Sequence, residues 1–97
     1  MEKNRSTAIM LYYIKEILNV EAYTVTCLFN TGEVKTVNLQ AIIQKYSDIN
    51  DGLVSQLRDP DYFKSVKLDS YGTLTWGNGV DFDPDNLYKM GALSFQP

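Results

Sequence analysis

The chain has 97 residues, of which 44% are hydrophobic and 22% charged, and its formal net charge is −3. This composition is typical of a globular protein and argues against disorder, and the length predicts a single domain over residues 1–97. The mild negative charge offers no basic surface to a phosphate backbone, so we expect no direct nucleic-acid partner. The sequence contains no histidine, which removes the usual general base and the commonest metal ligand.

The single cysteine, Cys27, cannot form an intrachain disulfide, and a reducing, cytoplasmic location is the expectation. The apolar run after Thr7 is interrupted by Lys15 and Glu16, so no signal peptide is predicted. No stretch approaches the roughly 18 apolar residues of a membrane-spanning helix, and we expect no membrane partner.

The N-terminal region leaves two interpretations open. Residues 1–7 are polar and predict a flexible leader. Within residues 8–18, Ile14 and Ile17 follow helical spacing, whereas Tyr12 and its neighbours suit a strand.

The next segment predicts a β-hairpin over residues 23–37. Residues rich in β-formers alternate, which places four of them on one inward face: Tyr23, Val25, Cys27 and Phe29. Gly32 is free to adopt the positive φ of a tight turn over residues 30–33. Cys27 is therefore interpreted as a buried, inert thiol rather than a nucleophile.

Two short helices are predicted after the hairpin. Asn38 is a good N-cap for the first, whose apolar residues recur at helical spacing: Leu39, Ile42, Ile43 and Tyr46. Residues 50–52 stop this helix, and a second one over residues 53–57 cannot pass Pro60.

The C-terminal half predicts short strands at residues 63–68, 73–76 and 80–82. Residues 69–72 form the first turn, and Asn78-Gly79 favours a type I′ turn for the second.

Asp83 before Pro84 is typical of a helix start, and residues 91–97 are expected to form an irregular tail. With residues 8–18 counted as a strand, the order is β-β-β-α-α-β-β-β-α. This order predicts an α+β fold with a small, mostly antiparallel sheet, two or three short helices, and the helices on one face.

The sequence resembles the domain-of-unknown-function 2442 family of small bacterial domains. The resemblance depends on an ordered set of motifs: Phe29-x-x-Gly32-Glu33 followed by Val37-Asn38-Leu39, then Leu57-x-Asp59-Pro60-x-x-Phe63, then Trp76-x-Asn78-Gly79-x-Asp81. It covers about residues 13–88. Asn38 stands where the family usually has Asp, and Gly77 where it usually has Pro.

The resemblance implies a β-β-α-β-β-β type of α+β domain and little about chemistry. Some members of the family are fused to helix-turn-helix domains or encoded beside small toxin-like proteins. An antitoxin-like role as a protein-binding module is therefore what the resemblance suggests.

The carboxylates of Asp81, Asp83 and Asp85 have the spacing that opens a calcium loop. That pattern needs Gly at its sixth position and Glu at its twelfth, where this chain has Asn86 and Ala92. We therefore interpret Asp83 as a helix cap and Asp85 as a partner of the helix dipole, and we expect no metal and no cofactor.

Aromatic residues give the remaining candidates. Trp76 is either a binding anchor or a core residue whose N–H bonds a nearby carbonyl. The sequence has seven tyrosines, and two interpretations stay open for six of them. They are expected either to line a groove or an oligomer interface, or to cover the rim of the core with their hydroxyls in water: Tyr12, Tyr13, Tyr46, Tyr62, Tyr71 and Tyr88. The candidate partner or ligand contacts are Trp76, Tyr88, Tyr46, Phe63 and Asp81.

The sequence thus predicts a non-enzymatic protein-interaction domain that binds another protein or itself. The alternative is a small-ligand-binding domain with an aromatic-lined pocket between helices and sheet, walled by Trp76, Tyr46 and Phe63. An enzyme is the third and least favoured class, because no nucleophile–base pair or ligand set is present.

Overall fold

The computed structural model describes residues 11–49 and 52–93. Its strands are β2 (Ile14–Glu21), β3 (Thr24–Phe29), β4 (Val34–Asn38), β5 (Lys67–Leu68), β6 (Leu74–Thr75) and β7 (Ala92–Leu93). Its helices are α1 (Gln40–Asp48), α2 (Gly52–Ser55), the 3₁₀ turn Gln56–Arg58, α3 (Pro60–Phe63) and α4 (Pro84–Met90). The predicted α+β class is confirmed.

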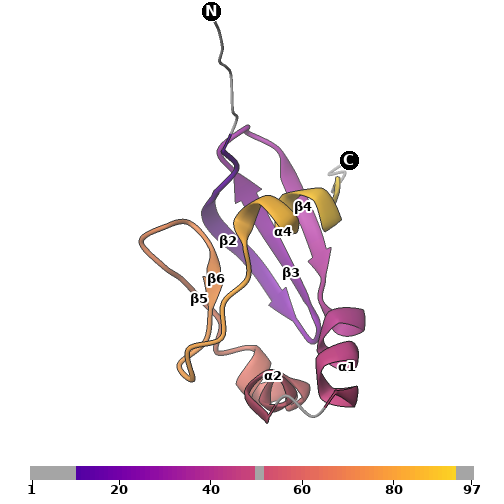
Figure 1. Cartoon of the computed structure of the whole chain (residues 1–97). Helices are drawn as coiled ribbons and strands as arrows, with labels where there is room; N and C mark the ends of the chain where they lie inside the picture. Colours follow the sequence, from indigo (N-terminus) through magenta and orange to yellow (C-terminus); the bar gives the residue numbers. More distant parts are fainter. Residues whose placement is uncertain (1–10, 50–51, 94–97) are drawn as a thin grey trace, which may run out of the picture.

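Within these residues the strands form an antiparallel sheet in the order β2-β3-β4-β7 and a separate β5-β6 pair. Figure 1 shows α4 crossing over β3 and β4, with α1 and α2 gathered at one end of the sheet and the β5-β6 hairpin beside β2. Helix α4 therefore covers part of one face of the sheet.

The ambiguous N-terminal segment is a strand, but it begins later and runs further than residues 8–18. Strand β2 starts at Ile14 and ends at Glu21, with register shifts after Ile14 and after Ile17. These irregularities let Ile14, Ile17 and Val20 lie opposite the inward residues of β3. Apolar residues therefore recur at every third position here because the strand contains two bulges, and not because the segment is helical. Residues 8–10 of the predicted segment, and all of the predicted leader, lie outside the described residues.

The hairpin predicted over residues 23–37 is confirmed as β3 and β4. Val25, Cys27 and Phe29 are completely buried on the inward face. Because side chains alternate along a strand, Thr26 and Leu28 point to the opposite, outer face.

Three hairpin turns in this chain share one construction. In each, a three-residue connection ends in a glycine with positive φ: Gly32 (89°), Gly72 (78°) and Gly79 (93°). The glycine N–H donates to the carbonyl three residues earlier, at Phe29, Asp69 and Trp76 respectively. This is the geometry of a tight turn followed by a left-handed residue. The two-residue type I′ turn predicted at Asn78-Gly79 is therefore wrong: Gly77, Asn78 and Gly79 together connect the paired residues Trp76 and Val80.

The first helix begins at Gln40, with Leu39 rather than Asn38 at the cap position. The side chain of Asn38 nevertheless accepts a hydrogen bond from the N–H of Gln40 at 2.9 Å. Helix α1 ends at Asp48, before the predicted stop at residues 50–52, of which 50 and 51 lie outside the described residues.

The strand predicted over residues 63–68 is wrong for most of its length. Pro60–Phe63 is helix α3, and only Lys67–Leu68 is extended. Asp59 caps α3 by accepting the N–H of Asp61 at 3.0 Å, and Asp83 caps α4 in the same way through Asp85 at 3.1 Å. The predicted start of α4 is thus confirmed. The same Asp-Pro-Asp pattern at residue 59 also begins a helix, which the sequence analysis did not predict.

Two further expectations differ at the C-terminus. The strand predicted over residues 80–82 is reduced to an isolated bridge between Asp81 and Thr75. The expected irregular tail contains β7, which pairs Ala92 with Thr36 and Leu93 with Lys35 of β4. The rest of that tail, residues 94–97, lies outside the described residues.

Candidate interaction surfaces

Trp76 and Phe63, two of the predicted contacts, lie in the core. Phe63 is fully buried and Trp76 is 3% exposed. Their rings are 5.6 Å apart, and the indole N–H of Trp76 donates to the carbonyl of Phe63 at 3.0 Å. A Trp ring with its only donor satisfied internally is a structural residue. Neither side chain presents a surface to a partner.

Asn78 joins the β6 turn to the helices. Its side-chain amide donates to the carbonyl of Leu53 at 3.0 Å and to Oε1 of Gln56 at 2.9 Å, while its Oδ1 accepts the N–H of Val80 at 3.0 Å. Its backbone N–H donates to the hydroxyl of Tyr62 at 2.9 Å. The Trp76–Asp81 motif therefore organises the fold rather than a binding surface.

Tyr88 is the centre of a cluster that holds α4 against the sheet. Its ring stacks on Tyr12 with centroids 3.7 Å apart, and the ammonium of Lys35 lies 3.5 Å from the ring centroid. Lys35 also donates to the Tyr88 carbonyl at 2.9 Å. Lys35 is buried on the inner face of β4, at 9% exposure. A cation placed on the last turn of a helix and on an aromatic ring gains from both contacts.

The hydroxyl of Tyr88 donates to Oε1 of Glu33. This hydrogen bond lowers the pKa of Glu33, helped by the hydroxyl of Thr31, and raises the pKa of Tyr88 to about 12. The cluster ties the β3-β4 turn to α4, and the Tyr88 hydroxyl is used inside the molecule.

The two remaining predicted residues lie apart from this cluster. Tyr46 is half-buried and packs against the core from α1. Asp81 is exposed next to its bridge with Thr75. The structure therefore does not gather the five predicted contacts into one site.

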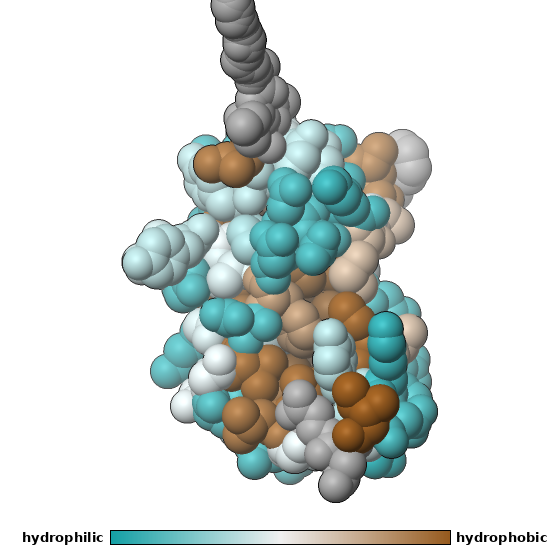
Figure 2. Space-filling view, viewed as in Figure 1, coloured by the Kyte–Doolittle hydropathy of each residue, from teal (hydrophilic) through white to brown (hydrophobic). Residues whose placement is uncertain are grey.

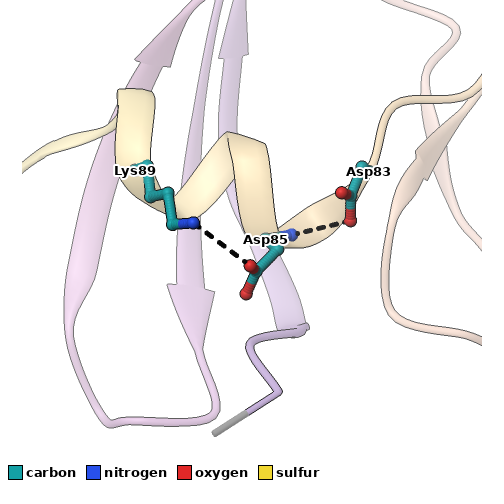
Figure 3. Close-up of polar contacts among 3 residues, drawn as sticks. All are labelled: Asp83, Asp85 and Lys89. Carbon is teal, nitrogen blue, oxygen red and sulfur yellow. Dashed lines mark hydrogen bonds and ion pairs between the residues drawn. The ribbon is translucent and has the colours of Figure 1, made fainter. Parts of the chain in front are cut away.

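The acidic stretch at the start of α4 is used locally. Figure 3 shows Asp83 receiving the N–H of Asp85, whose Oδ2 lies 3.5 Å from the ammonium of Lys89. Among the described residues, no group of three or more His, Cys, Asp or Glu side chains is arranged to hold a metal ion. The cap interpretation of Asp83 is confirmed.

Cys27 is buried on the inner face of β3, as predicted. Burial raises the pKa of its thiol to about 12, because the thiolate would lose its hydration. A thiol in this position is a poor nucleophile at neutral pH.

The outer face of the main sheet was not among the candidate contacts predicted from the sequence. Leu28 pairs with Val34 and Thr26 pairs with Thr36, and both pairs point away from the core. Leu28 and Val34 are half-buried, yet neither is among the residues packed against the hydrophobic core. The threonine hydroxyls of the second pair are 3.0 Å apart.

Charge on this outer face comes from β2. Glu16 lies opposite Leu28, and Glu21 lies opposite Thr24. The face thus grades from acidic side chains on β2 to aliphatic and hydroxyl side chains on β3 and β4. The alternation of side chains along β3 and β4 shows from the sequence which residues share this face. It does not show which of the two faces stays uncovered, because that depends on the tertiary packing.

The opposite side of the molecule has a different surface. Figure 2 shows hydrophilic side chains gathered over α4 and a hydrophobic region toward the end of the molecule where α2 lies. Ile49 and Leu53 are exposed in this part of the chain, at 65% and 52%.

The surface hollows in the described part of the chain include three with volumes of about 420, 170 and 380 Å³. None of them is lined by Trp76, Tyr46 or Phe63. The predicted aromatic pocket between helices and sheet is therefore not among them. No helix in the described ranges is long and apolar enough to cross a membrane.

Comparison with known proteins places this fold in a family. The family model described as "Protein of unknown function (DUF2442)" matches residues 14–91. The chain belongs to this family. No protein with curated annotation matches the chain.

A solved structure from Nitrosomonas europaea, described as "Putative DNA Binding Protein NE0471", has the same fold. It matches with a TM-score of 0.68 and 21% sequence identity, covering 88% of this chain and 52% of that chain. This chain thus spans about half the length of the solved chain. The likeness concerns the fold alone, and it agrees with the DUF2442 match.

Proposed function

We propose that this chain is a non-enzymatic protein-interaction domain whose contact surface is the outer face of the β2-β3-β4-β7 sheet. One observation carries the proposal: Leu28 and Val34 form the pair nearest the β3-β4 turn on the outer face, and neither of them packs against the core. Uncovered sheet faces with aliphatic side chains are surfaces that proteins bury by packing against a second sheet or another element.

The partner in this proposal is a second copy of the chain or another protein. A toxin-like partner remains the hypothesis that the family resemblance suggests. The buried, unpaired Cys27 supports a reducing compartment, and a cytoplasmic location is part of the same proposal.

Direct DNA binding is the second candidate, because the solved neighbour is described as a DNA-binding protein. The chemistry of the outer face speaks against this reading, since its charged residues on β2 include Glu16 and Glu21 and the chain has a net charge of −3. We therefore propose that this domain makes no direct nucleic-acid contact. Fluorescence anisotropy with duplex DNA at low salt tests this point, and tight, strongly salt-dependent binding would contradict it.

The main experiment replaces an outer-face aliphatic residue by a charged one. Leu28→Arg is expected to abolish self-association in light scattering after gel filtration, or to abolish capture of a native partner. Leu53→Arg makes the same chemical change at an exposed leucine of α2 and is expected to leave binding unchanged. The proposal fails if the wild-type chain is monomeric at high concentration and retains no partner, or if both variants behave alike.

A further inference from the structure

A second surface feature lies between the start of β2 and the β5-β6 turn. It is a hollow of about 420 Å³ lined by residues 13–15 and 69–72. Two tyrosines on its walls are unusually open to solvent: Tyr71 is 84% exposed and Tyr13 is 46% exposed. A tyrosine normally covers apolar neighbours with its ring, so two open rings at one hollow offer a surface for stacking.

The backbone around this hollow is held in place from both sides. The N–H of Ile14 donates to the carbonyl of Gly72 at 2.8 Å. Asn30 accepts the N–H of Tyr13 on its side chain at 2.9 Å and donates its own N–H to the Tyr13 carbonyl at 2.9 Å. A Cβ atom at Gly72 would lie only 2.6 Å from the Cβ of Tyr13, so the two walls meet as closely as glycine permits. The backbone that carries the walls of the hollow is therefore preformed, which lowers the cost of ordering it on binding.

The charges at the hollow are not equivalent. Asp69 uses Oδ1 to accept the backbone N–H groups of Tyr71 and Thr73, at 2.9 and 3.1 Å. These two hydrogen bonds shape the turn, and the carboxylate keeps its negative charge beside the hollow. Lys15, which lies at the first register shift of β2, lines the hollow and makes no ion pair within the described residues. Bulges commonly redirect a side chain toward a site at a sheet edge.

We propose that this hollow binds an aromatic side chain that stands next to a carboxylate, as at the C-terminus of a partner protein that ends in an aromatic residue. The aromatic ring packs between Tyr13 and Tyr71, and the carboxylate faces the ammonium of Lys15. This inference rests on the proposed protein-interaction function and names the kind of segment that the domain recognises beside the sheet face. The hollow is open, so binding of an isolated fragment is weak.

Two small probes separate ring stacking from charge recognition. N-acetyltryptophan carries the ring and the carboxylate, and N-acetyltryptophanamide carries the same ring without the charge. In NMR titrations of the full chain, both are expected to shift the backbone signals of residues 13–15 and 69–72. The carboxylate is expected to bind about two- to fivefold more tightly, the range of one exposed ion pair.

Three variants test the assignment. Tyr71→Ala changes a side chain in solvent and is expected to abolish the shifts from both probes. Lys15→Gln is expected to remove the difference between the probes while keeping ring binding, and Lys45→Gln on α1 is the charge-matched control that changes neither. Shifts located elsewhere, equal binding of both probes to the wild type, or an unaltered preference in Lys15→Gln would each overturn the proposal.

The same variants separate this inference from the proposed function. If neither probe binds the hollow while Leu28→Arg still abolishes association, the hollow assignment is wrong and the sheet-face proposal stands. If the probes bind as expected while the chain shows no association at all, the hollow assignment stands and the sheet-face proposal is wrong.

Discussion

Two hairpin turns of this protein have the same backbone geometry but differ in how far their aromatic residue is exposed. The turns that end in Gly79 and Gly72 both close with the glycine N–H on the carbonyl three residues earlier. Each turn has an aromatic residue at or near it, but Trp76 is 3% exposed and Tyr71 is 84% exposed. The aromatic residue in one turn builds the core, and the one in the other faces solvent.

The difference teaches that aromatic content alone does not identify a contact surface. What distinguishes the two residues is the presence of an internal partner for the polar end of the ring. The indole N–H of Trp76 reaches the carbonyl of Phe63 at 3.0 Å, so the whole side chain can be buried without loss of a hydrogen bond. Tyr71 projects beyond the reach of the core.

The largest expected effect tests this contrast directly. Trp76→Ala removes a buried ring and one of the two N–H donors of the Phe63 carbonyl, which also accepts the N–H of Val66, and we expect a loss of about 3–5 kcal/mol in the free energy of unfolding. Tyr71→Ala should change it by no more than about 0.5 kcal/mol. Urea denaturation followed by circular dichroism measures both. Similar losses for the two variants would break the comparison.

The next effect concerns the amide that fastens the Gly79 turn to the helices. Asn78→Asp replaces two N–H donors by a carboxylate oxygen that faces the Leu53 carbonyl and Oε1 of Gln56. We expect a loss of about 2 kcal/mol, because two hydrogen bonds are lost and the new carboxylate oxygen repels the two acceptors that it faces. Asn86→Asp, at an exposed position of α4, is the matched control. Equal unfolding midpoints for the two variants would show that the hydrogen bonds from Asn78 to the helical segment do not stabilise the fold.

A smaller effect is expected at the helix that follows this turn. Asp83→Ala removes the side-chain acceptor for the N–H of Asp85 and should cost about 1 kcal/mol. Asp81→Ala, at an exposed residue two positions earlier, should cost less. If Asp83→Ala keeps its stability but loses a binding activity, the Trp76–Asp83 region is a site after all.

The smallest effect appears only at the extremes of pH. The bond from Tyr88 to Glu33 requires a protonated phenol, whose pKa is raised from 10.0 to about 12, and an ionised carboxylate, whose pKa is lowered from 4.5. The phenol contribution is therefore complete below about pH 10 and is lost as the pH rises toward 12. The carboxylate contribution is present above the usual range of Glu and is lost as the pH falls through the lowered value.

Tyr88→Phe removes this bond and keeps the ring that stacks on Tyr12. The wild type should melt at a higher temperature than the variant at neutral pH, and the difference should shrink at both ends of the pH range. Thermal unfolding of both proteins across that range measures it. A difference that does not change with pH would mean that the hydroxyl contributes through packing rather than through Glu33.

Local sequence signals predicted much of the fold, and their failures have identifiable causes. Asp83-Pro84 predicts a helix start because a carboxylate cap precedes a proline at the first helical position. The same Asp-Pro-Asp pattern at Asp59 was interpreted only as the end of the preceding helix, with a strand predicted over residues 63–68. In the structure both aspartates accept the N–H two residues ahead. Aspartate before proline therefore predicts a helix start at both positions.

Two of the five candidate contacts lie in the core instead of on the surface. Trp76 and Phe63 were named because aromatic residues are common at interfaces, but a small core also needs large side chains, and these two fill it. Periodicity cannot say whether a ring is covered by the protein or by a partner. Among the residues that the structure describes, the exposed aromatics are Tyr13 and Tyr71, which the sequence analysis grouped with the other tyrosines.

By itself, the sequence determined the family, the α+β class, the β3-β4 hairpin with its inward Val25, Cys27 and Phe29, and the cap of α4. These features depend on neighbouring residues: side-chain alternation, glycine at positive φ, and aspartate before proline. Tertiary structure alone decided that β2 is a strand, because its bulges matter only against β3. It also decided which face of the sheet stays open, because covering a face depends on where α4 and the β5-β6 hairpin pack.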